Sequence, residues 1–334
     1  MASAQPLSAA SLGPPPRRRH GRRSSLRSWR LRDQAVFVLA WTVGIGLFAV
    51  VAALVGFFAV RGAQYLRPDL LVSHPAPSVS QSGSGGFLDA IEGTVLLGVI
   101  GLLIAAPIGV TTAVWVVEYG RPRWLSRIVE STVEMIAGTP DIVLAIFGLA
   151  LFELGVFAPL SFSEPGGAFG RSFLTAGAMM SLVALPSVYV ATRNGLVATP
   201  RQLREASYAL GKTRIATIRR VVLPAVRRDI ATGSTLGLGR IIGDTAIVIL
   251  LLGATLRIDT QSSTPLLGLL RGTGSTLTSY IYGNSPAGEG GAPQKAYAAA
   301  ALLLLIIIGL NWSVGRIGRI GGPPLHEPYR RLGA

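Results

Sequence analysis

The 334-residue chain contains no cysteine, and its only three histidines, His20, His74 and His326, are far apart in the sequence. Without cysteine the chain can form neither a disulfide nor a cysteine-based metal site, and it has no thiol nucleophile. The histidines fall in predicted tails or a loop, so no serine–histidine arrangement is supported. We therefore expect no catalytic residue, no metal site and no cofactor.

Acidic residues are also scarce. There are 16 Asp and Glu against 31 Lys and Arg, a formal net charge of +15, and the pI is about 11.3. Half of the residues are nevertheless hydrophobic, and the mean hydropathy is +0.51. The stretch 35–60 carries no charge, and about 20 apolar residues suffice for a helix to cross a bilayer. The sequence predicts an integral, multi-pass membrane protein with an all-α fold.

The basic residues are unevenly distributed about six candidate spans. These are 35–60, 93–117, 131–157, 172–192, 230–253 and 296–315. The tails and loops on one side hold 24 Lys and Arg, and the other three loops hold six. Such a bias follows the positive-inside rule, which places both termini in the cytoplasm of a cell-membrane protein. The charge thus reflects topology, and we expect contact with membrane lipid but not with nucleic acid.

This topology divides the chain into three parts. Residues 1–33 are expected to form a disordered basic cytoplasmic tail, residues 34–320 a six-span domain, and residues 321–334 a cytoplasmic C-terminal tail. The longest cytoplasmic loop, 193–229, has strong helix signals. Thr199-Pro200 favours a helix start and Gly211 a stop. A second helix from Thr213 is expected to end at Leu223-Pro224, because proline disrupts a helix interior.

Part of this loop resembles a phosphate-binding loop, since Ala206 is followed at the correct spacing by Gly211-Lys212-Thr213. A true phosphate loop requires a preceding strand and a flexible glycine-rich turn. Here the intervening residues favour a helix. A DNA-binding helix-turn-helix is a second alternative, but the unit is held between two membrane spans. Neither alternative is adopted.

The loop more closely resembles the EAA motif of ABC importer permeases. The motif stands here as Glu205-Ala206-Ser207, Gly211 and Val221-Val222-Leu223-Pro224, with Ser207 replacing Ala and Val221 replacing Ile. The resemblance implies the type I ABC importer permease architecture of six transmembrane helices. It also implies a cytoplasmic coupling helix that docks on a separate ATPase subunit, so that Glu205, Ala206, Ser207, Gly211, Leu223 and Pro224 serve ATPase coupling.

Further segments within about 90–315 are similar to the A-type permease of the phosphate-specific transporter, the PstA family. They are 94–120, ending in Glu-Tyr-Gly, 137–148 (AGTPDIVLAIFG) and 237–254 (GLGRIIGDTAIVILLLGA). The resemblance implies import of inorganic phosphate together with a second homologous permease, two ATPase subunits and an external phosphate-binding protein. Asp244 replaces the usual Glu, and the stretch 192–196 lacks the usual acidic residues, which adds positive charge at the cytoplasmic mouth.

Four polar residues are candidates for the substrate pathway. Arg240 and Asp244 are one turn apart in an apolar span and could pair on one helix face. Arg240 would then offer donors to an oxyanion in transit while Asp244 holds its side chain. Thr139 and Asp141 flank Pro140, which loosens the third span and could expose carbonyl groups to the pathway. The alternatives are a purely structural ion pair and a packing kink.

Other functions remain open. A permease for a different oxyanion, such as molybdate or sulfate, would share these features. A non-transport membrane scaffold would not require Arg240. A membrane-embedded enzyme is disfavoured because the sequence offers no nucleophile–base or metal-binding constellation.

Overall fold

The structure is a computed structural model that describes residues 31–75, 85–161, 163–164, 167–168, 170–253, 265–285 and 292–319. The predicted C-terminal tail and nearly all of the predicted N-terminal tail lie outside these residues. Contacts divide the chain into two units, 1–56 and 57–334, and each unit is considered by itself.

Helix α1 (Leu31–Tyr65) supplies the described part of the first unit, residues 31–56. Its apolar side chains are exposed, with Phe48 at 74%. An uninterrupted apolar helix with all faces exposed fits a lipid environment. The remainder of α1 belongs to the second unit, where the Phe57 ring meets Tyr297 of α12 (Pro293–Arg319) edge-on at 6.0 Å.

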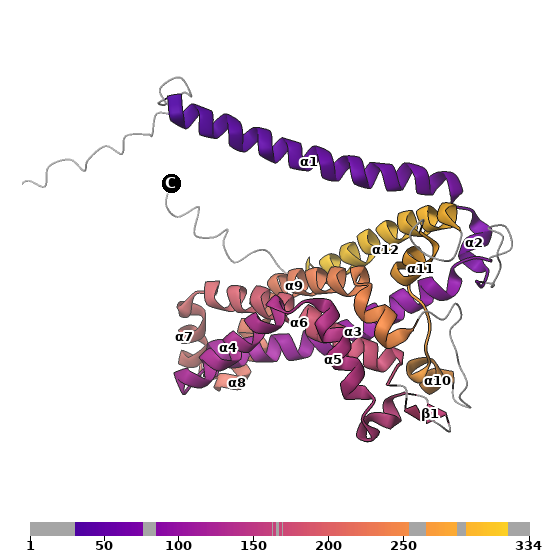
Figure 1. The fold of residues 1–334 in the computed structure, drawn as a ribbon. Coiled ribbons are helices and arrows are strands. Elements are labelled where there is room, and N and C mark those ends of the chain that lie inside the picture. Colours follow the sequence, from indigo (N-terminus) through magenta and orange to yellow (C-terminus); the bar gives the residue numbers. More distant parts are fainter. Residues whose placement is uncertain are drawn as a thin grey trace, which may run out of the picture. The chain divides into compact units, whose positions relative to one another are not determined.

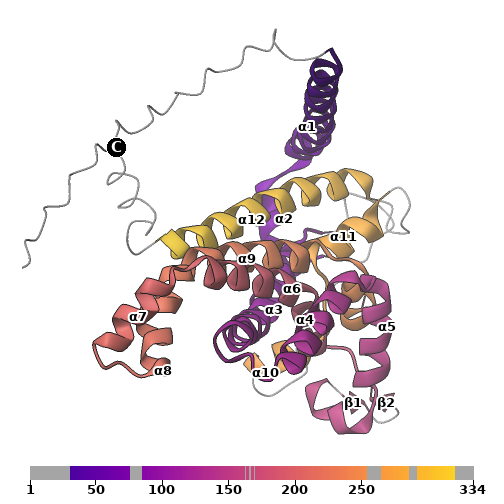
Figure 2. The same cartoon turned by 90° about the vertical axis from the view of Figure 1, so that its left-hand side faces the viewer.

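The core of the second unit is built on three helices, α3 (Leu88–Val114), α6 (Phe173–Ala198) and α9 (Leu223–Gly243). Helix α6 packs extensively against both α3 and α9, and α12 lies against α9 (Figures 1 and 2). Small residues permit the close approach, since a Cβ at Gly177 would collide with Ile100, and one at Gly233 would lie 2.9 Å from the Ser187 carbonyl. Glycine thus allows these helices to pack closely, whereas Gly239 and Gly243 have nothing within 4 Å of a Cβ placed on them.

Two of the expected spans are broken helices. The third consists of α4 (Arg123–Gly138) and α5 (Asp141–Phe152), which meet at 105°. Pro140 accounts for this break, because proline cannot donate the backbone hydrogen bond that a continuous helix needs. The fifth expected span is α9 followed by the π-helical turn η5 (Val248–Leu252), and it breaks at Asp244.

By length and composition, four described helices could cross a membrane, and the α4–α5 pair would make five. The all-α class is confirmed, but the count of six spans is not reached among the described residues.

The remaining helices and turns are α2 (Pro68–Val72), η2 (Trp115–Tyr119), η3 (Gly155–Leu160), α7 (Arg201–Ala209), α8 (Arg214–Thr217), η4 (Ile218–Val222), α10 (Pro265–Arg271) and α11 (Leu277–Asn284). Two short antiparallel strands, β1 (Ser163–Glu164) and β2 (Gly167–Ala168), pair with each other.

The expected helix end at Leu223-Pro224 is wrong. The backbone continues from α8 through the π-helical turn η4 into α9, where Pro224 occupies the first turn. The Leu223 N–H donates to the Ile218 carbonyl, five residues back. The widened π-helical turn directly before Pro224 accommodates the proline, so no break is required.

Candidate functional site

The first candidate site lies at the two helix breaks and contains Arg240. The Arg240 Nη2 atom is 3.9 Å from Asp141 Oδ1 at the start of α5. This separation is too long for a hydrogen bond, so the interaction is a loose ion pair whose guanidinium donors are available. The side chains are 41% and 37% exposed in the isolated chain. The pair therefore faces outward from the helix bundle.

Asp244 does not occupy the expected position beside Arg240 on one helix face, because α9 ends at Gly243. Its carboxylate instead accepts a hydrogen bond of 2.8 Å from the Ile247 N–H, as an N-cap residue does. Its backbone carbonyl accepts a bond of 3.1 Å from the Thr278 hydroxyl. The Asp244 carboxyl group also interacts with that of Asp141. The structure thus brings Arg240, Asp141 and Asp244 together across two broken helices.

Thr139 lies at the same break as Asp141, at the C-cap of α4. Its hydroxyl donates to the Met135 carbonyl at 2.8 Å. This bond satisfies a carbonyl of the last helical turn, which otherwise has no intrahelical partner. The hydroxyl oxygen can still accept a hydrogen bond, but its donor is already used within α4.

The second candidate site is helix α7, in the loop that the sequence predicts to be cytoplasmic, with the turn that follows it. Gly211 has φ +74°, and nothing lies within 4 Å of a Cβ placed on it. The Lys212 N–H donates to the Ser207 carbonyl at 3.3 Å across this turn. The expected glycine stop is therefore confirmed. Thr199 does not cap α7 as expected, because its hydroxyl donates to the Gly195 carbonyl at the end of α6.

The exposed surface of the α7–α8 unit is partly apolar. Glu205 and Ala206 are exposed, and so are Leu210 at 78% and Ile215 at 64%. Ser207 is buried, with its hydroxyl 2.9 Å from that of Thr217. The serine that departs from the EAA pattern is therefore paired with a second hydroxyl inside the unit.

Leu223 and Pro224 are separate from this exposed surface. They start α9, where Leu223 is half-buried and Pro224 is exposed. The EAA-like motif thus spans the whole unit from α7 to the first turn of α9.

Arg204 is a residue that sequence reasoning missed. Its guanidinium pairs with Glu118 of η2 at an N–O distance of 2.8 Å, and both side chains are mostly buried. It also donates to the carbonyls of Thr199 and Leu196, each at 2.9 Å. These carbonyls belong to the end of α6, whose final turn lacks intrahelical donors. One side chain therefore joins α7, the end of α6 and the turn that follows α3.

A second contact ties the same turn to the next helix. The Arg214 guanidinium of α8 lies 4.4 Å from the centre of the Tyr119 ring, a favourable cation–π distance. Glu118 and Tyr119 thus each hold one arginine of the α7–α8 unit. The sequence feature that could have indicated these contacts is Glu118-Tyr119 at the end of an apolar run, because a carboxylate in apolar surroundings requires a partner.

The extra positive charge expected at Arg193 is neutralised. Arg193 pairs with Glu130 of α4 at 2.8 Å, with side chains 39% and 30% exposed. The pair links α4 to α6 because the two helices pack together. Arg193 therefore adds no unpaired cation to this part of the molecule.

Residues 105–319 match the family described as binding-protein-dependent transport system inner membrane component. The chain is 32% identical over 281 residues to phosphate transport system permease protein PstA 1 of Mycobacterium tuberculosis strain H37Rv, which covers 84% of this chain and 83% of that protein. It is 30% identical over 275 residues to PstA of Mycobacterium leprae, with 82% of each chain covered. It is also 29% identical over 237 residues to PstC of Xylella fastidiosa strain 9a5c, covering 67% and 69%.

Solved structures share the fold. A bacterial ABC transporter involved in import of the acidic polysaccharide alginate has a TM-score of 0.54 at 16% identity, covering 86% of this chain and 98% of the other. An inward-facing form of the MetNI methionine ABC transporter has a TM-score of 0.50 at 21% identity, covering 70% and 93%. The chain belongs to the family of binding-protein-dependent transport system inner membrane components, and it is a permease subunit rather than an enzyme.

Proposed function

We propose that this chain is the permease subunit of an ATP-driven importer that moves inorganic phosphate from an external binding protein into the cytoplasm. The relatives at about 30% identity are named phosphate transport system permeases. The observation that carries the proposal is the accessible Arg240 at a pair of broken helices.

The accessibility of Arg240 favours a place on the substrate pathway. A charged side chain at the centre of a bilayer costs about 2.5–3.5 kcal/mol on insertion scales, so an exposed Arg240–Asp141 pair is disfavoured against lipid. A second homologous permease with a wet pathway between the two chains would remove this cost. Broken helices at such an interface are a recurring way to place donors near an anionic substrate.

The loose geometry of the pair suits transport better than tight binding. An entering phosphate would compete with Asp141 for the guanidinium, which is the best side chain for bidentate oxyanion contacts. Asp141 and Asp244 would in turn weaken retention of the anion by charge repulsion. The site would therefore both accept and release its substrate.

The exposed surface of α7 and α8 is proposed to dock on one of two ATPase subunits. Glu205 and Ala206 are exposed there. Arg204 is turned inward and holds α7 to the turn after α3 and to the end of α6, while Ser207 is turned inward against Thr217 of α8. Movement of a docked α7 would then reach α3 through Glu118. In this arrangement the C-terminus and the basic N-terminal tail are cytoplasmic, in line with the distribution of Lys and Arg.

Uptake of radiolabelled phosphate by the complete complex tests the proposal, with molybdate and sulfate as competitors. Arg240→Gln should reduce phosphate uptake at least about tenfold while the complex still assembles, since glutamine retains hydrogen bonding but lacks the charge. Arg171→Gln, an exposed arginine outside both sites, serves as the matched control. Normal phosphate uptake by an assembled Arg240→Gln complex would contradict a pathway role for Arg240 and leave the scaffold and structural-pair alternatives. Stronger competition by molybdate or sulfate than by phosphate would identify that oxyanion as the substrate instead.

A further inference from the structure

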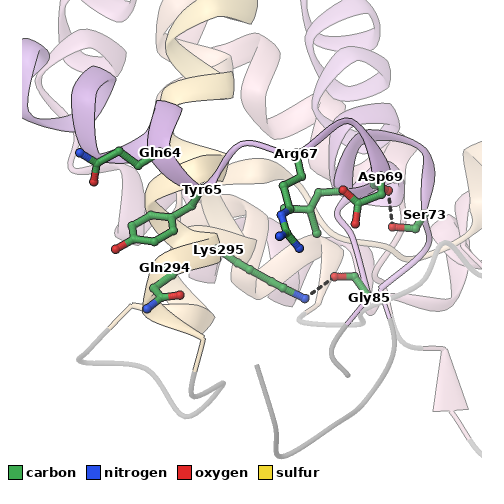
Figure 3. Close-up of a pocket in the computed structure, with 9 residues that line it drawn as sticks. Gln64, Tyr65, Arg67, Asp69, Ser73, Gly85, Gln294 and Lys295 are labelled. Carbon is green, nitrogen blue, oxygen red and sulfur yellow. Dashed lines mark hydrogen bonds between the residues drawn. The ribbon is translucent and has the colours of Figure 1, made fainter. Parts of the chain in front are cut away.

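A polar cavity of about 730 Å³ lies where the ends of three segments meet (Figure 3), and neither Arg240 nor α7 is part of its lining. It is lined by the end of α1, by α2 and its flanking residues, and by the first turn of α12. All of these residues belong to the second unit. Its principal polar side chains are Gln64, Arg67, Asp69, Ser73, Gln294 and Lys295.

Arg67 supplies an available cation in this cavity. Its side chain points into the space between α2 and α12 (Figure 3), and the residue is exposed. Within the part of the chain that the structure describes, its guanidinium makes no ion pair or side-chain hydrogen bond. Five N–H donors are thus offered in a fork that matches the geometry of a tetrahedral oxyanion.

Lys295 supplies a second cation from the opposite wall. The residue is only 8% exposed, and its ammonium group donates to the Gly85 carbonyl at 2.5 Å (Figure 3). Holding an ammonium group this deep is costly unless a polar or anionic partner is present. Gln64 and Gln294 also line the cavity.

Asp69 is the acidic group of this cavity and interacts electrostatically with Lys295. The lining therefore has a net charge of +1, from two cations and one carboxylate. The cavity is much larger than one small anion, since a water molecule occupies about 30 Å³. An anion would be held with part of its water and with limited affinity.

The position of these cations is unusual for the chain. In the topology proposed above, the external loops carry only six Lys and Arg, and two of the six line this one cavity. Because the positive-inside rule disfavours basic residues on the external side, topology does not account for their convergence. A local role for the two cations does.

We propose that this cavity is an oxyanion-binding site on the external face, where phosphate is held after it leaves the binding protein and before it reaches Arg240. The inference rests on the proposed function, from which it takes the side of the membrane and the substrate. Arg67 and Lys295 bind the anion, and Asp69 limits its affinity so that the anion can move on.

The test measures binding of radiolabelled inorganic phosphate to the purified permease–ATPase complex in lipid nanodiscs, without binding protein. An Arg240→Gln background removes the pathway arginine, so the remaining saturable binding reports the cavity. Arg67→Gln should weaken this binding about tenfold, as expected for loss of a charge-assisted contact. Asp69→Asn should strengthen it severalfold, and Arg171→Gln should leave it unchanged.

The opposite signs expected for Arg67 and Asp69 separate an electrostatic site from general damage to the fold. Two results of this measurement would overturn the inference: no saturable binding in the Arg240→Gln background, or equal affinity after Arg67→Gln. A separate co-purification with the binding protein provides a third: if Arg67→Gln abolishes association of the binding protein but leaves phosphate binding intact, the cavity is a docking site for an acidic side chain of that protein. Phosphate uptake with Arg240 intact is measured separately, so normal uptake without cavity binding rejects this inference and leaves the proposed function standing.

Discussion

Arg204 and Glu118 are 86 residues apart in the sequence and form a mostly buried ion pair with an N–O distance of 2.8 Å. The same arginine donates to two carbonyls at the end of α6. The pair therefore connects α7, which we propose to contact the ATPase, with the turn that ends α3. Buried ion pairs are sensitive to loss of one partner, which costs roughly 3–5 kcal/mol.

Glu118→Gln should uncouple ATP hydrolysis from transport. Glutamine keeps an acceptor for Arg204 but lacks the charge, so α7 remains folded and able to dock while its link to α3 weakens. We expect the amount of phosphate imported per ATP hydrolysed to fall severalfold in proteoliposomes, with the ATPase still recovered in the complex.

Glu130→Gln is the matched control for this prediction. It removes a carboxylate from the Arg193 pair, which has the same 2.8 Å separation but is 39% and 30% exposed. Exposed ion pairs contribute about 0–1 kcal/mol to stability, and the Arg193–Glu130 pair does not involve α7. An unchanged import-to-hydrolysis ratio in Glu118→Gln, or an equal loss in Glu130→Gln, would contradict the proposed role of the buried pair.

Gly211→Val should weaken recovery of the ATPase subunit and stop uptake while the protein stays in the membrane. The position has φ +74° but open space around it, so the penalty comes from the backbone. A left-handed conformation costs an ordinary residue roughly 1–2 kcal/mol, and a β-branched one is poorly tolerated. Co-purification of the ATPase and phosphate uptake are measured together.

Two further variants serve as controls for the Gly211→Val prediction. Gly211→Asn should be milder than Gly211→Val, because asparagine adopts left-handed conformations more readily. Lys212→Ala should retain most of the transport, since Lys212 is not part of a phosphate loop in this structure. Loss of nucleotide binding by the purified chain in Lys212→Ala would contradict the docking role of α7.

Labelling of single cysteines should establish which face of the membrane each loop occupies, and the absence of native cysteine makes the readout clean. A membrane-impermeant thiol reagent added to intact cells should label Ser285→Cys after α11. It should miss Gln202→Cys, an exposed position on α7. Gln202→Cys should become reactive once the cells are permeabilised. Labelling of Gln202→Cys in intact cells would invert the proposed topology.

The sequence by itself determined the features that depend on local composition and spacing. Long uncharged runs predicted membrane helices, and four of them are long and apolar enough to cross a membrane in the structure. Gly211 predicted the end of α7 because only glycine adopts the left-handed backbone cheaply. The EAA-like spacing and the segments within about 90–315 were sufficient to identify the family.

Only the tertiary structure decided which polar groups meet. A helical spacing of four residues suggested Arg240 and Asp244 as partners, but the break at Asp244 turns that carboxylate to the Ile247 N–H and leaves Arg240 with Asp141. The pairing of Arg204 with Glu118 and the convergence of Arg67 and Lys295 join segments that are far apart in the chain. Local periodicity carries no information about such contacts, because the packing of whole helices determines which side chains can reach one another.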